Sequence, residues 1–335
     1  MKKIISVLLS AVLLSLLLTG CEPDGGESSA PESGAVSAST SSEPAASGEE
    51  SAPAESPLDD FEFAENDTGI TVVKYLGDDK DVVIPAQVNG KPVTVIGEKS
   101  FRYNQTIISV TIPEHVTTIR ELAFHYCTFL QTVILPQGVT AIEDWAFYEC
   151  IHLSKINLPD SLVLLGESAF SDCFDLTEIT IPGSIETWDG AFSFSGLKTV
   201  TISDGVTQIG SSAFYDTNLI TVILPQSVKE IKISAFSYCE SLENVILNEG
   251  LERIGEKAFC RTESLRAITI PASVKEIGKN PFKESYIEKV MFEGDAPELF
   301  VEEDEEPAGT FTVYYHEGAK GFTSPTWNGY KTEIW

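Results

Sequence analysis

The stretch "LQTVILPQGVTAIEDWAFYEC", residues 130–150, decides the fold, because variants of it recur along the chain. Its Phe147 has counterparts upstream and downstream at steps of 22 or 23 residues. These phenylalanines are Phe101, Phe124, Phe147, Phe170, Phe192, Phe214, Phe236, Phe259 and Phe282. The consensus reads L-x-x-V-x-I-P-x-x-V-x-x-I-G-x-x-A-F-x-x-C, and the tetrapeptide VKEI stands at both 228–231 and 274–277. A fixed period in this range is typical of a solenoid.

Each repeat divides into two parts. Val133 and Leu135 are two residues apart, as in a strand, and are expected to face the core, with Thr132 and Ile134 facing outward. In the second part, residues 139–150, apolar residues are three and four apart, which predicts a helical turn or a short helix. Strands of adjacent coils would stack about 4.8 Å apart. We therefore expect one parallel sheet with an exposed face.

Composition divides the chain into segments. We predict a signal peptide over 1–20, a lipidated cysteine with a disordered acidic Ser/Ala/Pro linker over 21–58, an N-terminal cap over 59–93, repeats over 94–292 and a C-terminal cap over 293–335. The linker cannot bury enough apolar surface to offset the entropy of ordering it. Caps are expected because an open end of a solenoid would expose its core.

The amino-terminal segment has the layout of a secretory signal peptide. Lys2 and Lys3 precede an apolar run that is too short for a comfortable membrane span. Leu18–Cys21 (LTGC) resembles the lipobox of bacterial lipoproteins, in which the cysteine receives a diacylglyceryl group and becomes the new N-terminus. This resemblance implies that Cys21 is a lipid anchor and that the protein is exported and held at the cell membrane or cell surface. An ordinary signal peptide with an incidental cysteine is the alternative.

The charge balance excludes two classes of partner. The chain carries 22 basic and 51 acidic residues, for a net charge of −29. Nucleic acid requires Lys and Arg to neutralise its phosphates, and anionic lipid attracts basic segments. We therefore expect no nucleic-acid partner, and contact with the membrane through the lipid anchor only.

Five cysteines fall within the repeats. Cys127, Cys150, Cys173 and Cys239 each stand three residues after the repeat phenylalanine, and Cys260 stands one residue after it. Other coils place Asn, Ser or Thr at or near the same slot, so the slot favours a small polar group that packs inside a turn and bonds to the backbone. Buried free cysteine is common. A disulfide between neighbouring coils is the alternative, although parallel Cβ vectors work against it.

The sequence offers little support for a metal site or a catalytic site. A zinc set of His125, Cys127, Cys150 and His152 is disfavoured because the histidines occupy different repeat offsets. The run Glu302–Pro307 lacks the spacing of a calcium loop and indicates a solvated acidic loop. No hydrolase, metalloprotease or nucleotide-binding motif is present. We expect no metal and no cofactor.

The repeats resemble the BspA-like leucine-rich repeat family of bacterial surface proteins. The resemblance covers about Thr68 to Trp335 and includes the end segments "GITVVKYLGDDKDVVIPAQVNGKPVTVIG" and "FEGDAP…TVYY…W". The fold class expected is an α/β-type, β-rich leucine-rich repeat solenoid of about nine coils, capped at both ends. The resemblance also implies export and, by analogy with some members, adhesion to other proteins. The repeat itself fixes only the architecture.

The outward face of the predicted sheet is the candidate binding site. Its middle positions are Thr111, Ile134, Asn157, Thr180, Thr201, Ile223, Ile246 and Thr269. Exposed apolar side chains in a row can mark a partner site, although strands favour β-branched residues for their own reasons.

We therefore expect a non-catalytic binding or adhesion module for a protein or glycan partner. One alternative is a structural envelope component without a specific ligand. The other is an enzyme with a site in the C-terminal cap, built from Asp295, His316 and the acidic run.

Overall fold

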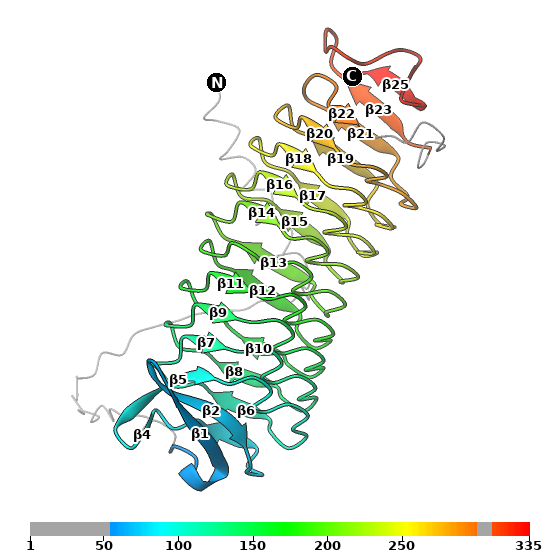
Figure 1. Ribbon diagram of the computed structural model, residues 1–335. Helices are drawn as coiled ribbons and strands as arrows, with labels where there is room; N and C mark the ends of the chain where they lie inside the picture. The colour runs from blue at the N-terminus through cyan, green and yellow to red at the C-terminus, as the bar shows by residue number, and fades with distance from the viewer. Residues whose placement is uncertain (1–53, 300–309) are drawn as a thin grey trace, which may run out of the picture. The chain divides into compact units, whose positions relative to one another are not determined.

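The computed structural model describes residues 54–299 and 310–335, which form a stack of about 11 turns (Figure 1). The predicted repeat solenoid is confirmed. Most turns carry two strands, one in a line whose strands are mostly three or four residues long (the longer strands) and one in a line whose strands are mostly two residues long (the shorter strands). Within each line, strands of adjacent turns pair in parallel except at a few interruptions. The second line of parallel pairing is additional to the single sheet that the sequence predicts.

The longer strands carry the first part of each repeat. They are β3 (Asp81–Val83), β6 (Ser109–Thr111), β8 (Thr132–Ile134), β10 (Lys155–Ile156), β12 (Glu178–Ile181), β13 (Thr199–Ile202), β15 (Thr221–Ile223), β17 (Asn244–Ile246), β19 (Ala267–Ile270), β21 (Lys289–Phe292), β23 (Thr312–Tyr315) and β25 (Tyr330–Ile334). They pair as β10-β8-β6-β3, β12-β13, β15-β17 and β19-β21-β23-β25, with β24 (Thr326–Trp327) beside β25. Hydrogen-bonded strand pairing is thus interrupted along this side.

The shorter strands form the second line. They are β5 (Lys91–Ile96), β7 (Thr118–Ile119), β9 (Ala141–Ile142), β11 (Leu164–Leu165), β14 (Gln208–Ile209), β16 (Glu230–Ile231), β18 (Arg253–Ile254), β20 (Glu276–Ile277) and β22 (Glu298–Leu299). At the N-terminal end this line is extended by the hairpin β1 (Phe61–Asn66) and β2 (Gly69–Tyr75), while β4 (Gln87–Val88) pairs with β5.

Turns take the place of the expected helical segment. Within the described ranges the only helix is a 3-10 turn, η1 (Leu58–Asp60). In the stretch 139–150, Trp145 and Glu149 have positive φ values of 54° and 52°, which an α-helix cannot accommodate. Their backbone N–H groups donate to the next coil, with Trp145 N bonded to Glu167 O at 2.9 Å. Spacings of three and four therefore arise here from successive turns.

The core is a column of stacked phenylalanines. Val133 and Leu135 are buried and Ile134 is exposed, as predicted. Phe147 is fully buried and lies 5.0 Å from the ring of Phe124, centroid to centroid, and 5.1 Å from Phe170. Both rings are within 2° of parallel to it. A side chain of this size contributes strongly through its buried area.

The two ends continue this column with their own aromatic rings. At the N-terminal end, Tyr75 stacks on Phe101 at 5.2 Å and Phe61 packs on Tyr75 at 5.1 Å. At the other end, Phe311 meets Phe282 edge-on at 5.8 Å and stacks on Tyr330 at 4.2 Å. The end segments therefore cover the last rings of the repeat core, as a solenoid requires.

Candidate functional site

Seven of the eight candidate binding residues lie on the outward side of the longer strands and Asn157 directly follows β10, and we call the eight the sheet-face row. Strand register places Thr111 beside Ile134 and Ile223 beside Ile246. The three isoleucines are 53%, 56% and 49% exposed. Burial of an isoleucine of this kind on binding is worth about 1.5–3 kcal/mol, whereas its exposure contributes nothing to folding.

The row is longer than the sequence analysis predicted. Register continues from Thr269 to Met291 and then to Tyr314, and both of these side chains are half-buried. At the other end Val83 stands beside Thr111. The similarity of "KVMF" to "AITI" could have revealed Met291, but Tyr314 lies beyond the last regular repeat, where spacing gives no guide.

The middle of the row borders a polar hollow. Asn157, Thr180 and Thr201 line a cavity of about 340 Å³ with Glu178 and Thr199. The hollow spans β10, β12 and β13, where the pairing between β10 and β12 is interrupted. Hydroxyl, amide and carboxylate groups here flank the more apolar positions Ile134 and Ile223. The row therefore offers apolar contacts on either side of a hydrogen-bonding centre.

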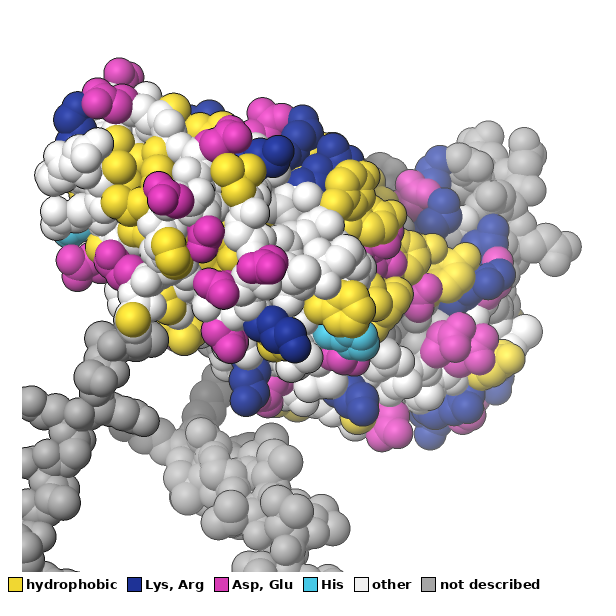
Figure 2. Space-filling model, turned by 90° about the horizontal axis from the view of Figure 1, so that it is seen from below, with side chains coloured by type: hydrophobic (Ala, Val, Ile, Leu, Met, Phe, Trp, Pro, Cys, Tyr) yellow, Lys and Arg dark blue, Asp and Glu magenta, His cyan; other side chains and the backbone are white. Residues whose placement is uncertain are grey.

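Charge on the described surface is mixed. Seen from the side drawn in Figure 2, acidic and basic side chains are interspersed among hydrophobic and neutral ones. The row itself contains no charged residue.

None of the helices within 54–299 and 310–335 has the length and hydrophobicity needed to span a bilayer.

The cysteine slot has the geometry expected of a packed turn. Cys127, Cys150 and Cys173 are buried free thiols, each donating to the carbonyl oxygen of a phenylalanine in the preceding coil at 3.0 to 3.3 Å. Burial raises the pKa of the Cys127 thiol to about 12 and raises that of Cys150 well above its usual value. These thiols are therefore poor nucleophiles, because reaction requires the thiolate.

The zinc candidates are engaged separately. Cys127 and Cys150 point into the core, His125 Nδ1 lies 3.3 Å from Arg102 Nε, and His152 Nδ1 lies 2.8 Å from Asp175 Oδ2. Among the residues that the structure describes, no group of three His, Cys, Asp or Glu side chains could hold a metal ion.

The candidates in the C-terminal cap have structural partners. His316 Nε2 lies 3.0 Å from Glu293 Oε2, and its ring stacks on Trp335 at 4.9 Å. Asp295 Oδ1 accepts a hydrogen bond from the backbone N–H of Lys320 at 2.7 Å. The acidic run Glu302–Pro307 and the proposed anchor Cys21 lie outside the described residues.

Comparison with known proteins gives a consistent result. The model of the BspA type leucine-rich repeat region matches residues 94–190 and 188–289, with six copies. A leucine-rich repeat protein of T. pallidum is similar in structure, with 29% identity and a TM-score of 0.50, covering 63% of this chain and 91% of that one. A leucine-rich cell surface protein of Faecalibacterium prausnitzii shares the fold at 24% identity and a TM-score of 0.50, covering 72% and 89%. No curated protein matches.

Proposed function

Because the chain belongs to the BspA-type leucine-rich repeat family, we propose that it is a membrane-anchored extracytoplasmic lipoprotein whose solenoid binds a protein or glycan partner. The lipid on Cys21 would hold the molecule at the outer side of the membrane, and the linker would keep the solenoid away from the lipid surface. A diacylated cysteine meets the requirement of more than one chain for stable anchoring. The solenoid would then act as a non-catalytic adhesion module at the cell surface.

One observation carries this proposal, namely the sheet-face row. Ile134, Ile223 and Ile246 are each about half exposed to water, on the face of the strands that points away from the core. Such side chains on a regular, rigid sheet lose little conformational entropy when a partner covers them. The similar F. prausnitzii protein is described as a cell surface protein, which supports the proposed location.

A structural envelope role is the alternative that uses the same anchor. It requires no specific ligand, so the sheet-face row would be a product of strand propensity alone. The cell-surface binding role and the structural role differ in whether contacts concentrate on this face.

Photo-crosslinking distinguishes the two. A photoreactive residue at Ile223 should capture a defined partner in intact cells, whereas the same residue at Ile233 should not. Ile233 is a matched control because it is 55% exposed and lies outside the row. Equal capture from both positions, or capture from Ile233 alone, would contradict the proposed role of the row.

A further inference from the structure

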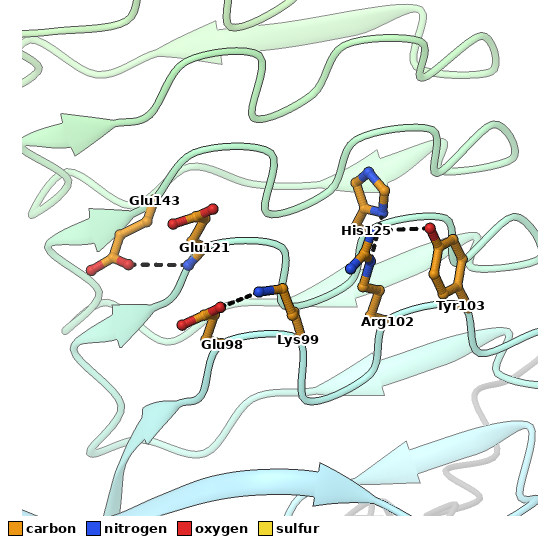
Figure 3. A network of polar contacts seen from close by, with 7 residues as sticks. All are labelled: Glu98, Lys99, Arg102, Tyr103, Glu121, His125 and Glu143. Atoms are coloured by element: carbon orange, nitrogen blue, oxygen red, sulfur yellow. Dashed lines mark hydrogen bonds and ion pairs between the residues drawn. The ribbon is translucent and has the colours of Figure 1, made fainter.

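A cluster of polar and aromatic side chains lies on the turns that follow the repeat phenylalanines. Arg102 Nε donates to His125 Nδ1 at 3.3 Å, and its Nη2 donates to Tyr103 Oη at 2.9 Å (Figure 3). The guanidinium carbon lies 4.5 Å from the centre of the Tyr103 ring. The centre of the Tyr126 ring is 5.4 Å from that of Tyr103. Arg102 is therefore held in place by neutral groups.

His125 supports this arrangement in its neutral form. Burial lowers its pKa, and the positive charge of Arg102 lowers it further, while Glu149 opposes the shift. A neutral ring can accept the hydrogen bond from Arg102, which a protonated ring cannot do. The Tyr126 phenol is hydrogen-bonded to Glu149, which raises its pKa to about 12 and keeps the hydroxyl uncharged. Glu149 acts on His125 and Tyr126, and no hydrogen bond or ion pair among the described residues joins a carboxylate to the guanidinium of Arg102.

Arg102 is one of several basic residues without an ion pair in the described part of the chain, but its guanidinium is fixed by His125 and Tyr103. Among the described residues no carboxylate forms an ion pair with it, although the net charge of the protein is −29. Arg261 provides an internal comparison, since its guanidinium also lies over a tyrosine ring, that of Tyr238, at 4.9 Å. There Glu284 from the next coil supplies the carboxylate. Arg102 stands one residue after its repeat phenylalanine and Arg261 stands two residues after its own, and the side chain that the next coil places against Arg102 is His125. No described carboxylate pairs with Arg102 as Glu284 does with Arg261.

The surroundings leave room for one anionic group. Arg102 and Tyr103 line a hollow of about 290 Å³ that reaches the N-terminal cap. Three cations, Lys74, Lys99 and Arg102, and two carboxylates, Glu62 and Glu98, line this hollow, and Lys99 contacts Glu98. One positive charge therefore remains. A hollow of this volume is at the lower end of ligand sites and suits a single ring.

We propose that the Arg102–Tyr103 corner binds a single carboxylate carried on a sugar ring, such as a terminal uronic acid of a glycan. Two of the five guanidinium N–H groups are used within the protein, and the remaining donors can hold a carboxylate in the bidentate manner. The Tyr103 ring, on a side chain that is 55% exposed, offers an apolar surface for the ring carbons.

The residues further along this face select against polyanions. Glu149 and Asp172 occupy the positions equivalent to Tyr103 in the third and fourth coils. Their charge would repel a second anionic group, while their oxygens can accept hydrogen bonds from sugar hydroxyls. The site lies on the turns and not on the longer strands, so it is independent of the sheet-face row.

Calorimetric titration of the full-length protein in detergent with glucuronic acid tests this inference. Glucose, which lacks the carboxylate, and acetate, which lacks the ring, should each bind at least tenfold more weakly. Arg102→Gln should weaken glucuronate binding at least tenfold, and the matched variant Arg261→Gln should retain it, with thermal unfolding confirming that both are folded.

Several outcomes would overturn the proposal. Absence of binding at millimolar glucuronate, or unchanged binding by Arg102→Gln, would show that Arg102 does not form a carboxylate site. Equal affinity for acetate would show that the sugar ring contributes nothing to binding. Tighter binding of a glutamate-rich peptide would assign the corner to an acidic polypeptide.

Discussion

At the scale of single residues, each coil repeats the same slots with different occupants, and the exceptions are informative. The slot before the repeat phenylalanine holds alanine in most coils, but Ser100 fills it in the first. Ser100 is 2% exposed, and its Oγ has no hydrogen-bond partner among the described residues. Ser237 is equally buried, but its Oγ donates to Lys257 O at 2.6 Å. The two serines therefore differ in whether their hydroxyl is satisfied.

Ser100→Ala should stabilise the protein. Burial of an unsatisfied hydroxyl costs about 1–3 kcal/mol, and alanine already fits this slot in neighbouring coils. Ser237→Ala should lower the free energy of unfolding by about 0.5–1.5 kcal/mol, because it removes a hydrogen bond that is made. Chemical denaturation of both variants measures the difference. A Ser100→Ala protein less stable than the wild type would show that this hydroxyl has a partner.

His125 should make stability depend on pH. Its folded-state pKa lies below the ordinary value of 6.5, so between these two values the unfolded chain binds a proton that the folded protein does not. The free energy of unfolding should therefore fall as the pH drops below about 6.5, and level off below the folded-state pKa. His125→Gln should reduce the slope between pH 7 and 5 in thermal unfolding. An identical slope in the variant would contradict a lowered pKa.

Residue identity and spacing predicted some slots better than others. The cysteine slot was predicted from its Ser, Thr and Asn equivalents, because a core turn admits only small polar groups. Arg102 could not be singled out, since its importance depends on which side chain the next coil provides, and the sequence gives no rule for that position.

At the scale of elements, each coil pairs only with its neighbours. The period predicted the stacked strands and the phenylalanine column, because a fixed repeat must bury the same positions in each turn. The period did not predict where the strand pairing between neighbouring coils is interrupted. Trp188 replaces the expected isoleucine, and its Nε1 donates to Gln208 O at 3.0 Å. The step from Phe170 to Phe192 is 22 residues, one fewer than the steps before it. In this shorter coil the backbone approaches that of the preceding coil closely, since a Cβ on Gly196 would lie 1.9 Å from Phe174 O.

Phe147→Ala should loosen the stack locally. Truncation of a fully buried phenylalanine costs about 3–5 kcal/mol, and the rings of Phe124 and Phe170 lose their neighbour. Since solenoid stability is a sum of local and neighbour contributions, hydrogen exchange should accelerate mainly over residues 124–170. Wild-type protection in that range would contradict the central role of Phe147. A uniform loss from end to end would show that the coils unfold as one unit.

At the scale of the whole molecule, function depends on where the solenoid is held and which face it presents. The family membership and the coil geometry establish the scaffold, while the anchor and the partner are proposals. Neither could be derived from the repeat, because the same architecture supports many different ligands.

Cys21→Ala should release the protein from the membrane. Without its thiol the chain cannot receive the diacylglyceryl group, and the remaining affinity of an acidic protein for anionic lipid is small. Metabolic labelling with a fatty acid and membrane fractionation measure the effect. Cys260→Ala is the control, because Cys260 is buried in a coil and should leave both labelling and membrane association unchanged. Retention of Cys21→Ala at the membrane would argue against the lipid anchor.

The most direct test of the sheet-face row is the affinity of the Ile223→Glu and Ile246→Glu double variant for the partner found by crosslinking. A charge in an apolar contact must be desolvated, so the Kd should rise at least tenfold, equivalent to 1.4 kcal/mol. The melting temperature should stay within a few degrees of the wild type, because both side chains are about half exposed. Ile233→Glu should bind normally. Wild-type affinity in the double variant would show that the partner does not use this face.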